Sequence, residues 1–355
     1  MFGFTDHIKP NQTPAVKPIR IRRASRPQRL ILMGTGPFAV PAFDALCEAG
    51  HEVALVVTRP AVTNRSRKGP PPSPVRDFAA RHSFSLFDPE SINTPASVAR
   101  LADERAALLV VCDYGQILSS DALSTAPLGG INLHGSLLPA YRGAAPVQWA
   151  VLNGDAFAGV SIIHMTPRLD GGPVLATAKI SIEPKDTSGT LEAKLATLGI
   201  EPTLASVELL AQWNGVEVIG KPQDKSLVSR APRLSKPFGQ IDWNRSAVEI
   251  DRHIRGMQPW PGAFTDVTIS PDREPLRIAV RTATIELGLV VPPSATPGLL
   301  LDDHSLRIAT GPAASPGVIR IDRLQPAGRN EVTAEEFIRG HRIRSGAKFG
   351  SRIQP

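Results

Sequence analysis

The sequence predicts an α/β domain with a parallel sheet, followed by a small β-barrel domain. In the first part of the chain, short apolar runs alternate with stretches of helical periodicity, which is typical of a parallel sheet covered by helices on both faces. After residue 235, short β-type runs are separated by proline and glycine instead. At 355 residues, the chain is long enough for two domains that each bury a core.

The first domain is expected to span residues 30–214. Its first strand leads into a helix in which apolar residues recur at helical spacing from Val40 to Cys47, and Gly50 is expected to end that helix. One long helix is expected over 190–213, where leucines and a valine share a face. The strands are expected at 30–33, 52–58, 107–112, 129–134, 159–165 and 173–182.

The second domain is expected at residues 235–345, after a polar, proline-interrupted linker at 215–234. Its predicted helix follows Ser246, which forms the pattern of a capping box with Glu249. About five short strands follow, which suits a small barrel such as an OB fold. Residues 346–355 are expected to form a basic tail.

The positive charge of the protein is concentrated at its amino terminus. The net charge is +7, and residues 1–29 hold seven lysines and arginines against one aspartate. No apolar stretch there resembles a secretory signal, so we interpret the segment as a disordered extension. A transit segment and a basic arm that touches nucleic acid are the alternatives.

Two features indicate a cytoplasmic protein. No apolar run approaches the roughly 18 to 20 residues of a membrane span, so no membrane contact is expected. Cys47 and Cys112 both lie in apolar segments and are expected to be core thiols in a reducing compartment rather than a disulfide. We also expect the protein to be a monomer.

The segment "GTGPFA" at 34–39 resembles the glycine-rich turn that binds a dinucleotide after a first strand. That fingerprint expects an acidic residue at the end of the second strand to hold a ribose, but Thr58 and Arg59 stand there. We therefore expect no dinucleotide, and an NADP-type use of the arginine is the weaker alternative. A tight turn between strand and helix explains the glycines.

Three polar side chains are the candidates for chemistry. Asn132 and His134 lie two residues apart in an extended segment, so they project to the same side at the carboxyl end of a parallel strand. Asp170 lies in "RLDGG", whose glycines allow the loop to bend back over the same edge. An amide can donate to an oxyanion, an imidazole can carry a proton and a carboxylate can orient it, which suits direct acyl transfer through a tetrahedral intermediate. From the spacing alone, a structural Asn-x-His pair is the alternative.

Longer stretches carry a family resemblance. The segment "INLHGSLLPAYRGAAPVQWAVLNGD", followed by "RLDGGPVL", is similar to the formyltetrahydrofolate-dependent formyltransferases, most closely to the members that act on methionyl-tRNA. Supporting stretches such as "ILMGTGPFAVPAFDAL", "YGQIL", "DTSGTLEAKLATLG" and "QPWPGAF" extend it over nearly all of residues 30–339. The resemblance implies a Rossmann-like first domain joined by a linker to an OB-like second domain.

The resemblance also implies the reaction and its residues. The protein would transfer the formyl group of 10-formyltetrahydrofolate to the amino group of methionyl initiator tRNA, with Asn132, His134 and Asp170 as the catalytic trio. Folate contacts are implied for Ser136, Leu137, Leu138 and Pro139, and tRNA contacts for Arg65, Arg67 and Lys68.

The spacing of possible metal ligands points to no metal site. No cysteine–histidine cluster or aspartate array has metal-ligand spacing, so no metal is expected.

Two positions depart from the family pattern. In the basic loop after the second strand, Ser66 stands where the family usually has an arginine between two glycines. In "VVCDYG", Asp113 stands where many relatives have a small apolar residue, so the wall of the pocket is expected to differ.

The main alternative is a sugar-nucleotide N-formyltransferase, which shares the trio and the Ser-Leu-Leu-Pro stretch. The basic loop, the "RGAAP" stretch and the basic end of the second domain favour a large polyanion as the acceptor instead. A formyltetrahydrofolate hydrolase and a non-catalytic RNA-binding protein are the weaker alternatives.

The basic loop leads to a prediction about tRNA binding. If Arg65, Arg67 and Lys68 contact phosphates, neutralising all three should raise the KM for tRNA and flatten its salt dependence, by about one unit of slope or less for each lost contact. The KM for the folate should hardly change, because the implied folate contacts lie in another turn. Steady-state kinetics at several salt concentrations measure both constants. A raised folate KM with unaltered salt dependence would assign the loop to the folate site.

Overall fold

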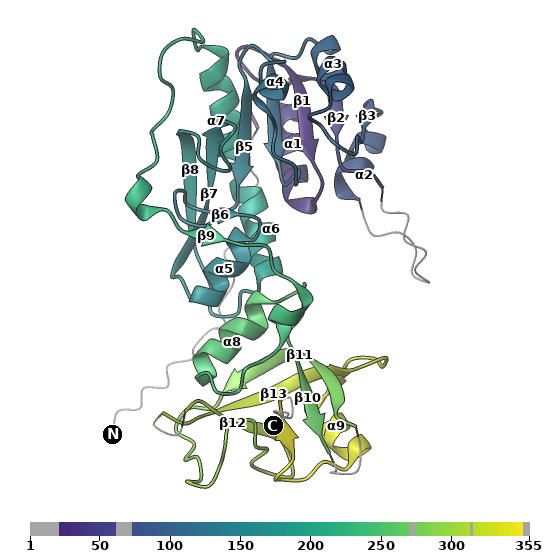
Figure 1. Cartoon of the computed structure of the whole chain (residues 1–355), viewed down its shortest axis with the longest axis vertical. Helices are drawn as coiled ribbons and strands as arrows, with labels where there is room; N and C mark the ends of the chain where they lie inside the picture. The colour runs from purple at the N-terminus through teal and green to yellow at the C-terminus, as the bar shows by residue number, and fades with distance from the viewer. Residues whose placement is uncertain (1–20, 62–72, 270–273, 313–314, 351–355) are drawn as a thin grey trace, which may run out of the picture.

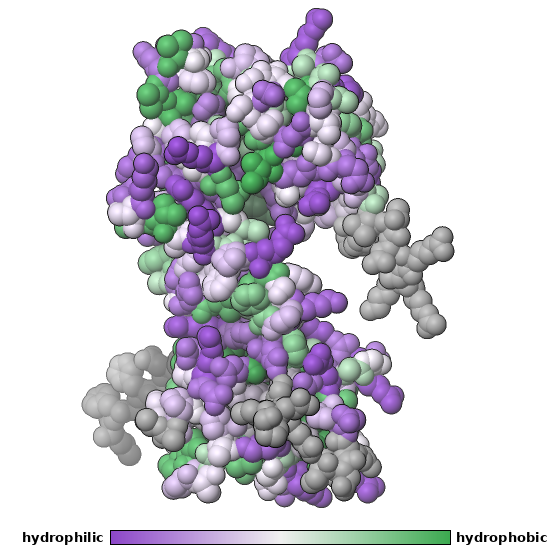
Figure 2. Space-filling view, in the orientation of Figure 1, coloured by the Kyte–Doolittle hydropathy of each residue, from purple (hydrophilic) through white to green (hydrophobic). Residues whose placement is uncertain are grey.

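The computed structural model describes residues 21–61, 73–269, 274–312 and 315–350. These residues form an α/β body and a β-barrel that are stacked along the long axis of the molecule, with helix α8 (Ala247–Gly256) between them (Figure 1). Hydrophilic side chains cover much of the visible face of both bodies (Figure 2). Across these described ranges, no helix is long and apolar enough to cross a membrane.

The α/β body is built on a seven-stranded sheet. In sheet order, its strands are β3 (Leu86–Phe87), β2 (Glu52–Val57), β1 (Arg29–Gly34), β4 (Leu108–Cys112), β5 (Gly130–His134), β7 (Phe157–His164) and β8 (Val174–Ser181). The first five are parallel, which confirms the predicted class, but β7 and β8 run antiparallel to their neighbours. The short turn at 165–173 cannot make the long crossover that a parallel pair needs, so β7 and β8 form a hairpin.

Helices cover both faces of this sheet, as predicted. Because successive strand residues point to opposite faces, Leu30 and Leu32 pack in one apolar core while Ile31 and Met33 pack in the other. All four side chains are fully buried. The helices of this body are α1 (Val40–Glu48), α2 (Pro74–Arg81), α3 (Pro95–Asp103), α4 (Ser120–Leu123), α5 (Pro146–Asn153), α6 (Ser188–Leu198) and α7 (Ile200–Ala211).

Two local expectations hold in this body. Helix α1 ends just before Gly50, which has a φ of +88° and so takes the left-handed conformation of a helix end. Cys47 and Cys112 are free thiols, the first half-buried and the second fully buried. Burial raises the pKa of Cys47 to about 11, so its thiol stays protonated at neutral pH.

The single long helix predicted at 190–213 is in fact two helices, α6 and α7, which meet at Gly199. The chain bends there against β5, and a Cβ on Gly199 would stand only 2.9 Å from Leu133 Cδ1. Leu195 and Val207 lie in the same apolar core on either side of the bend. Because the apolar periodicity runs through the bend, the sequence pattern does not reveal it.

The second body is a nearly closed antiparallel barrel, which confirms the predicted OB-like class. Its strands are β10 (Phe264–Thr268), β11 (Leu276–Ile285), β12 (Leu306–Thr310), β13 (Gly317–Pro326), β14 (Val332–Thr333) and β15 (Lys348–Phe349), with helix α9 (Ala334–His341) beside them. The strands pair in the order β12–β13–β11–β10–β15. Leu299 and Leu300 close the ring, because the first bridges Lys348 of β15 and the second bridges Ile308 of β12.

The predicted domain ends differ from the structure at both termini. The described part of the amino-terminal extension packs on the α/β body, since the Ala24 N–H donates to the Ala49 carbonyl at 2.8 Å and β1 already begins at Arg29. At the other end, β15 lies inside the predicted tail at 346–355 and pairs with β10. The barrel therefore includes Phe349.

The predicted linker at 215–234 is tied to the α/β body along part of its length. Its strand β9 (Arg230–Ala231) pairs in parallel with β6 (Arg142–Gly143), which follows β5. Nearer the start of the linker, Lys221 forms a two-way backbone bridge with Val174, the first residue of β8. The segment between the two bodies is thus a structured part of the first one.

Helix α8 makes the contact between the two bodies. It begins at the predicted capping box of Ser246 and Glu249 and packs against α5. At its other end, the Gly256 carbonyl accepts a hydrogen bond from the buried Ser188 hydroxyl at 2.7 Å, and the Arg255 guanidinium donates to the Asp186 carbonyl at 2.9 Å. These bonds join the start of α6 to the end of α8.

Candidate active site

A cavity of about 440 Å³ opens at the carboxyl ends of β4 and β5, where open α/β sheets bind ligands. Asn132 and His134 of β5 both line it, and because Ile131 and Leu133 pack in the apolar core, this pair projects to the other side as predicted. Asp170 lines the same cavity from the turn between β7 and β8. The three side chains that the sequence singles out are therefore brought together.

The turn that carries Asp170 reaches the cavity from the opposite end of β5. It starts beside the first residue of that strand, where the Met165 N–H donates to the Gly130 carbonyl at 2.7 Å, and then folds back toward His134. Gly172 permits the sharp bend, because a Cβ there would stand 1.8 Å from the His164 carbonyl oxygen. The loop therefore bends back toward the carboxyl end of β5, as the sequence suggested.

Hydrogen bonding sets the proton positions on the His134 ring. Its Nε2 lies 2.9 Å from the Tyr141 carbonyl oxygen, which can only accept, so Nε2 carries a hydrogen. The other ring nitrogen, Nδ1, lies 3.8 Å from Asp170 Oδ1. In the neutral ring Nδ1 is therefore the unprotonated nitrogen, and a proton that it takes up faces a carboxylate. The imidazole is buried at 6% exposure, so bulk water does not compete freely for this position.

Asp170 and Tyr141 hold their positions with strained backbones. Asp170 has a φ of +48° and Tyr141 a φ of +61°, a region that residues other than glycine rarely occupy. The carboxylate of Asp170 accepts the Gly143 N–H through Oδ2 at 2.8 Å, which leaves Oδ1 directed at His134. Strain of this kind persists only where several contacts hold the chain, and it is concentrated at functional sites.

The cavity wall also carries charged side chains away from His134 and Asp170. Asp113, Glu192 and Arg233 all line the cavity. Burial raises the pKa of the Asp113 carboxyl, although the Gly36 amide and the Arg233 charge oppose the rise. Burial also raises the pKa of Glu192, and the nearby charge of Asp113 adds to that effect. Two carboxyls with raised pKa therefore lie on this part of the cavity wall, with Arg233 as the nearby opposite charge.

Asp113 also accounts for the glycine-rich turn after β1. A Cβ on Gly36 would stand 2.3 Å from Asp113 Oδ2, so the turn needs a glycine to admit this carboxylate. In a dinucleotide site, the same turn faces a pyrophosphate. Here a negative side chain of the protein lies against it and would repel that group.

The Ser-Leu-Leu-Pro stretch lies behind the cavity. Ser136 and Leu138 are buried, and none of its four residues is among those that line the cavity. The Ser136 hydroxyl donates to the Ala140 carbonyl at 2.6 Å, and the Leu138 N–H donates to the Ser161 hydroxyl of β7 at 3.0 Å. These bonds anchor the turn that follows β5. Leu137 and Pro139 are half-buried beside them.

The cavity wall includes residues that the sequence reasoning did not single out. The segment that follows β4 contributes Tyr114, Gln116 and Ile117, and the Asp170 turn contributes Leu169. Ile117 is 55% exposed and Leu169 is 51% exposed, so the mouth of the cavity presents apolar side chains. The sequence could have indicated Tyr114, Gln116 and Ile117, because they follow a parallel strand and ligands bind at the carboxyl ends of such strands.

The basic loop cannot be placed at this site. Arg65, Arg67 and Lys68 lie outside the described residues. Within the described part of the chain, no group of three or more histidine, cysteine, aspartate or glutamate side chains could hold a metal ion.

Comparisons with known proteins match both bodies. Residues 28–206 match the family model for formyl transferase, and residues 233–342 match the one for the formyl transferase C-terminal domain. A methionyl-tRNA formyltransferase of Rhodopirellula baltica is 48% identical over 335 residues, which cover 92% of this chain and 98% of that protein.

Two solved structures share the fold at low sequence identity. A variant of HypX from Aquifex aeolicus is 14% identical with a TM-score of 0.58; the match covers 89% of this chain but only 49% of HypX, so this chain spans about half of that protein. WlaRD, a sugar 3N-formyl transferase solved in the presence of dTDP and 5-N-formyl-THF, is 13% identical with a TM-score of 0.58. That match covers 86% of this chain and 100% of WlaRD.

The two carboxyls with raised pKa lead to a prediction about stability. Because the folded protein holds the Glu192 and Asp113 protons more tightly than the unfolded chain, their ionisation destabilises the fold at neutral pH. Glu192→Gln and Asp113→Asn should each raise the free energy of unfolding at pH 7. The gain should shrink as the pH falls to the ordinary carboxyl range, where the wild-type groups are protonated as well. Urea unfolding at pH 7 and pH 4 measures it.

Asp224 provides the matched control. Hydrogen bonds from Ser226 lower the pKa of this exposed carboxyl, so the sign of the linkage is reversed. Asp224→Asn should therefore lower stability slightly at pH 7. Equal effects of all three substitutions, or gains at 113 and 192 that persist at pH 4, would contradict the assignment.

Proposed function

The chain belongs to the formyl transferase family, and from that premise we propose that it transfers the formyl group of 10-formyltetrahydrofolate to the amino group of methionyl initiator tRNA. The convergence of Asn132, His134 and Asp170 at one cavity is the observation that carries the reaction. The 48% identity with a methionyl-tRNA formyltransferase, over nearly the whole of both chains, supports the acceptor.

The cavity suits a folate as formyl donor. Its volume of about 440 Å³ falls in the usual range of small-molecule sites, and Ile117 and Leu169 offer apolar surface for a flat ring. When bound, this donor supplies a formyl group on a nitrogen that can leave. Ser136, Leu137, Leu138 and Pro139 remain proposed residues of the folate site. Because they lie behind the cavity wall, we propose an indirect role, in which their hydrogen bonds fix the turn that follows β5.

Asn132 is assigned to the formyl oxygen. Negative charge develops on that oxygen as the amine attacks the formyl carbon, and the side-chain amide can donate a hydrogen bond to it. Asn132 is half-buried on β5, an interior strand of the sheet, which fixes its backbone beside the cavity. A donor that is already oriented stabilises the tetrahedral intermediate without reorganising at the moment of reaction.

His134 and Asp170 are assigned to the proton. As the new C–N bond forms, the attacking nitrogen must lose a proton, and Nδ1 of His134 is the free position that can take it. The Asp170 carboxylate, 3.8 Å away, then faces the positive ring and stabilises it. The same proton can pass to the leaving nitrogen of the folate when its bond to the formyl carbon breaks, with the electron pair staying on that nitrogen. Protons therefore balance over the cycle without a further group.

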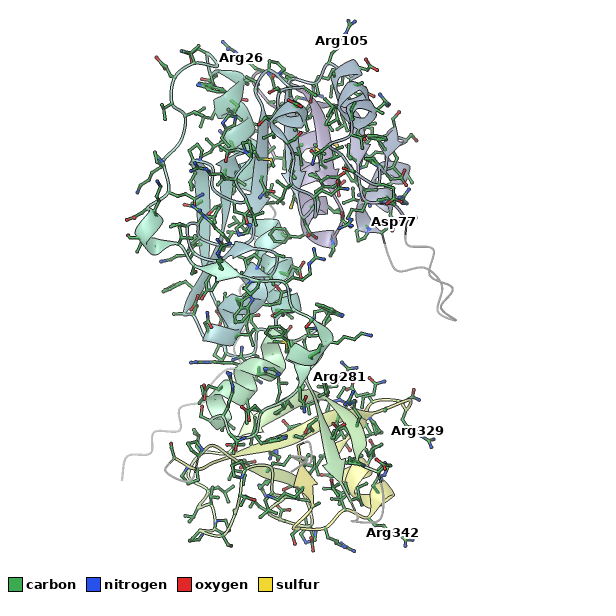
Figure 3. All side chains as sticks on the ribbon, viewed as in Figure 1. Arg26, Asp77, Arg105, Arg281, Arg329 and Arg342 are labelled. Atoms are coloured by element: carbon green, nitrogen blue, oxygen red, sulfur yellow. The ribbon has the colours of Figure 1, made fainter. Side chains whose placement is uncertain are left out.

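A polyanionic acceptor agrees with the charge of the second body. Arg329 and Arg342 project from the barrel into solvent (Figure 3), and both are exposed. Exposed arginines of this kind can contact phosphates. We propose that Arg65, Arg67 and Lys68 add contacts from the first body. A sugar-nucleotide amine is the second candidate acceptor, on the evidence of the shared fold with WlaRD alone.

The acceptor is tested by supplying 10-formyltetrahydrofolate with one partner at a time. Release of tetrahydrofolate is measured with methionyl initiator tRNA, with an amino-sugar nucleotide and with water alone. We expect rapid release with the tRNA and background release with the others. Faster release with the sugar nucleotide or with water would refute the proposed acceptor.

The trio is tested by substitution. Asn132→Ala should lower turnover by about two to three orders of magnitude, as loss of an oxyanion donor does, while leaving the fold intact. His134→Ala and Asp170→Ala should each be severe, and the double variant should lose far less than the product of both, because the two side chains act on one proton. Turnover numbers from folded variants decide this. Near-normal turnover of Asn132→Ala, or multiplicative losses at 134 and 170, would contradict these roles.

A further inference from the structure

The strained residues of the site are held by the segment between the two bodies. Gln223 of this segment reaches the Asp170 turn, where its side-chain Nε2 donates to the Asp170 carbonyl at 2.8 Å and to the Gly172 carbonyl at 2.7 Å. Its Oε1 accepts from Arg142 Nε at 3.1 Å and from the terminal nitrogen of the same guanidinium at 2.7 Å. One amide thus joins the Asp170 turn to the residue beside Gly143.

The partners of Gln223 dictate how its amide is oriented. Carbonyl oxygens can only accept and a guanidinium can only donate, so the NH₂ group must face Asp170 and Gly172 while the oxygen faces Arg142. All the hydrogen-bonding capacity of the side chain is used. Gln223 is half-buried, whereas the residues on either side of it are exposed. This burial and the four hydrogen bonds distinguish Gln223 from the exposed residues of the same segment.

The same segment holds Tyr141, whose carbonyl fixes the His134 ring. The Tyr141 N–H donates to the Ser229 hydroxyl at 2.9 Å, and the Arg142 N–H donates to the Ser229 carbonyl at 2.9 Å. The pairing of β9 with β6 continues this contact as far as Gly143, where a Cβ would stand 2.6 Å from the Ala231 carbonyl oxygen. The segment thus contacts both residues with strained backbones, Tyr141 through Ser229 and Asp170 through Gln223.

We propose that residues 221–231 are a positioning element of the active site, in which Gln223 holds the Asp170 carboxylate where it faces Nδ1 of His134. Gln223 acts through Asp170 and Gly143 and touches no reacting atom. This inference rests on the proposed function for its kinetic readout. Its structural readout is the hydrogen bond from the Gly143 N–H to Asp170, which can be followed in the free protein.

Two substitutions separate hydrogen bonding from packing. Gln223→Ala removes every bond of the side chain. Gln223→Glu keeps the shape and the contact with Arg142, but it places an oxygen against two carbonyl oxygens. If the donated bonds position Asp170, both variants should lower kcat by about ten- to a hundredfold with little change in either KM, as small displacements of catalytic groups do. If Gln223 only fills space, the glutamate variant should keep the wild-type rate.

The experiment measures kcat, both KM values and amide hydrogen exchange at Gly143 for each folded variant. Exchange at Gly143 should be faster in Gln223→Ala and Gln223→Glu. In an Asp170→Ala background, Gln223→Ala should cause no further loss of kcat, because the group that it positions is gone. One control should match the wild type: Gln212→Glu, which makes the same chemical change at the exposed residue that follows the end of α7.

Three results would overturn the inference: wild-type kcat in Gln223→Glu, an undiminished loss of kcat in the Asp170→Ala background, or unchanged exchange at Gly143. Failure of the proposed function is distinguishable from these. It would show as a wild-type protein that does not formylate methionyl-tRNA, and the exchange measurement would still test the positioning role.

Discussion

The active site depends on one short segment, Tyr141 to Gly143, which holds both ionisable members of the trio. The Tyr141 carbonyl binds one nitrogen of the His134 ring, and the Gly143 N–H binds one oxygen of the Asp170 carboxylate. What remains free on each side chain is therefore the atom that faces the other, at 3.8 Å. Because these restraints come from backbone groups, they fix the directions of the side chains without adding a charge of their own.

The rest of the fold brings partners to that segment. The hairpin of β7 and β8 delivers Asp170 by folding back over β5, and the chain between the two bodies supports the segment from outside through β9. In the sequence, the strands of the barrel come after β9. The two bodies are thus joined by a stretch that belongs structurally to the site, so the position of the barrel and the geometry of the trio share one element.

The cavity has two regions of different electrostatic character. Near His134, the Gly143 N–H binds one oxygen of the Asp170 carboxylate and the other oxygen faces the imidazole. Near Gly36, burial raises the pKa of Asp113 and Glu192, and Arg233 is the opposing charge for Asp113. A carboxylate against the glycine-rich turn disfavours a phosphate there, because the two negative charges repel each other.

The sequence by itself determined the two domain classes and most strands, and it singled out three side chains that line one cavity. Apolar alternation and helical spacing depend on local chemistry, and residues two apart on a strand must share a side, so Asn132 and His134 could be paired without coordinates. The tertiary structure decided what local patterns do not encode. The bend at Gly199 depends on Leu133, the route of the Asp170 turn depends on which way β7 runs, and the role of Gln223 depends on two carbonyls about fifty residues earlier in the chain. Contacts between residues so far apart in the chain arise only when the sheet assembles, because no periodicity in a window of the sequence spans them.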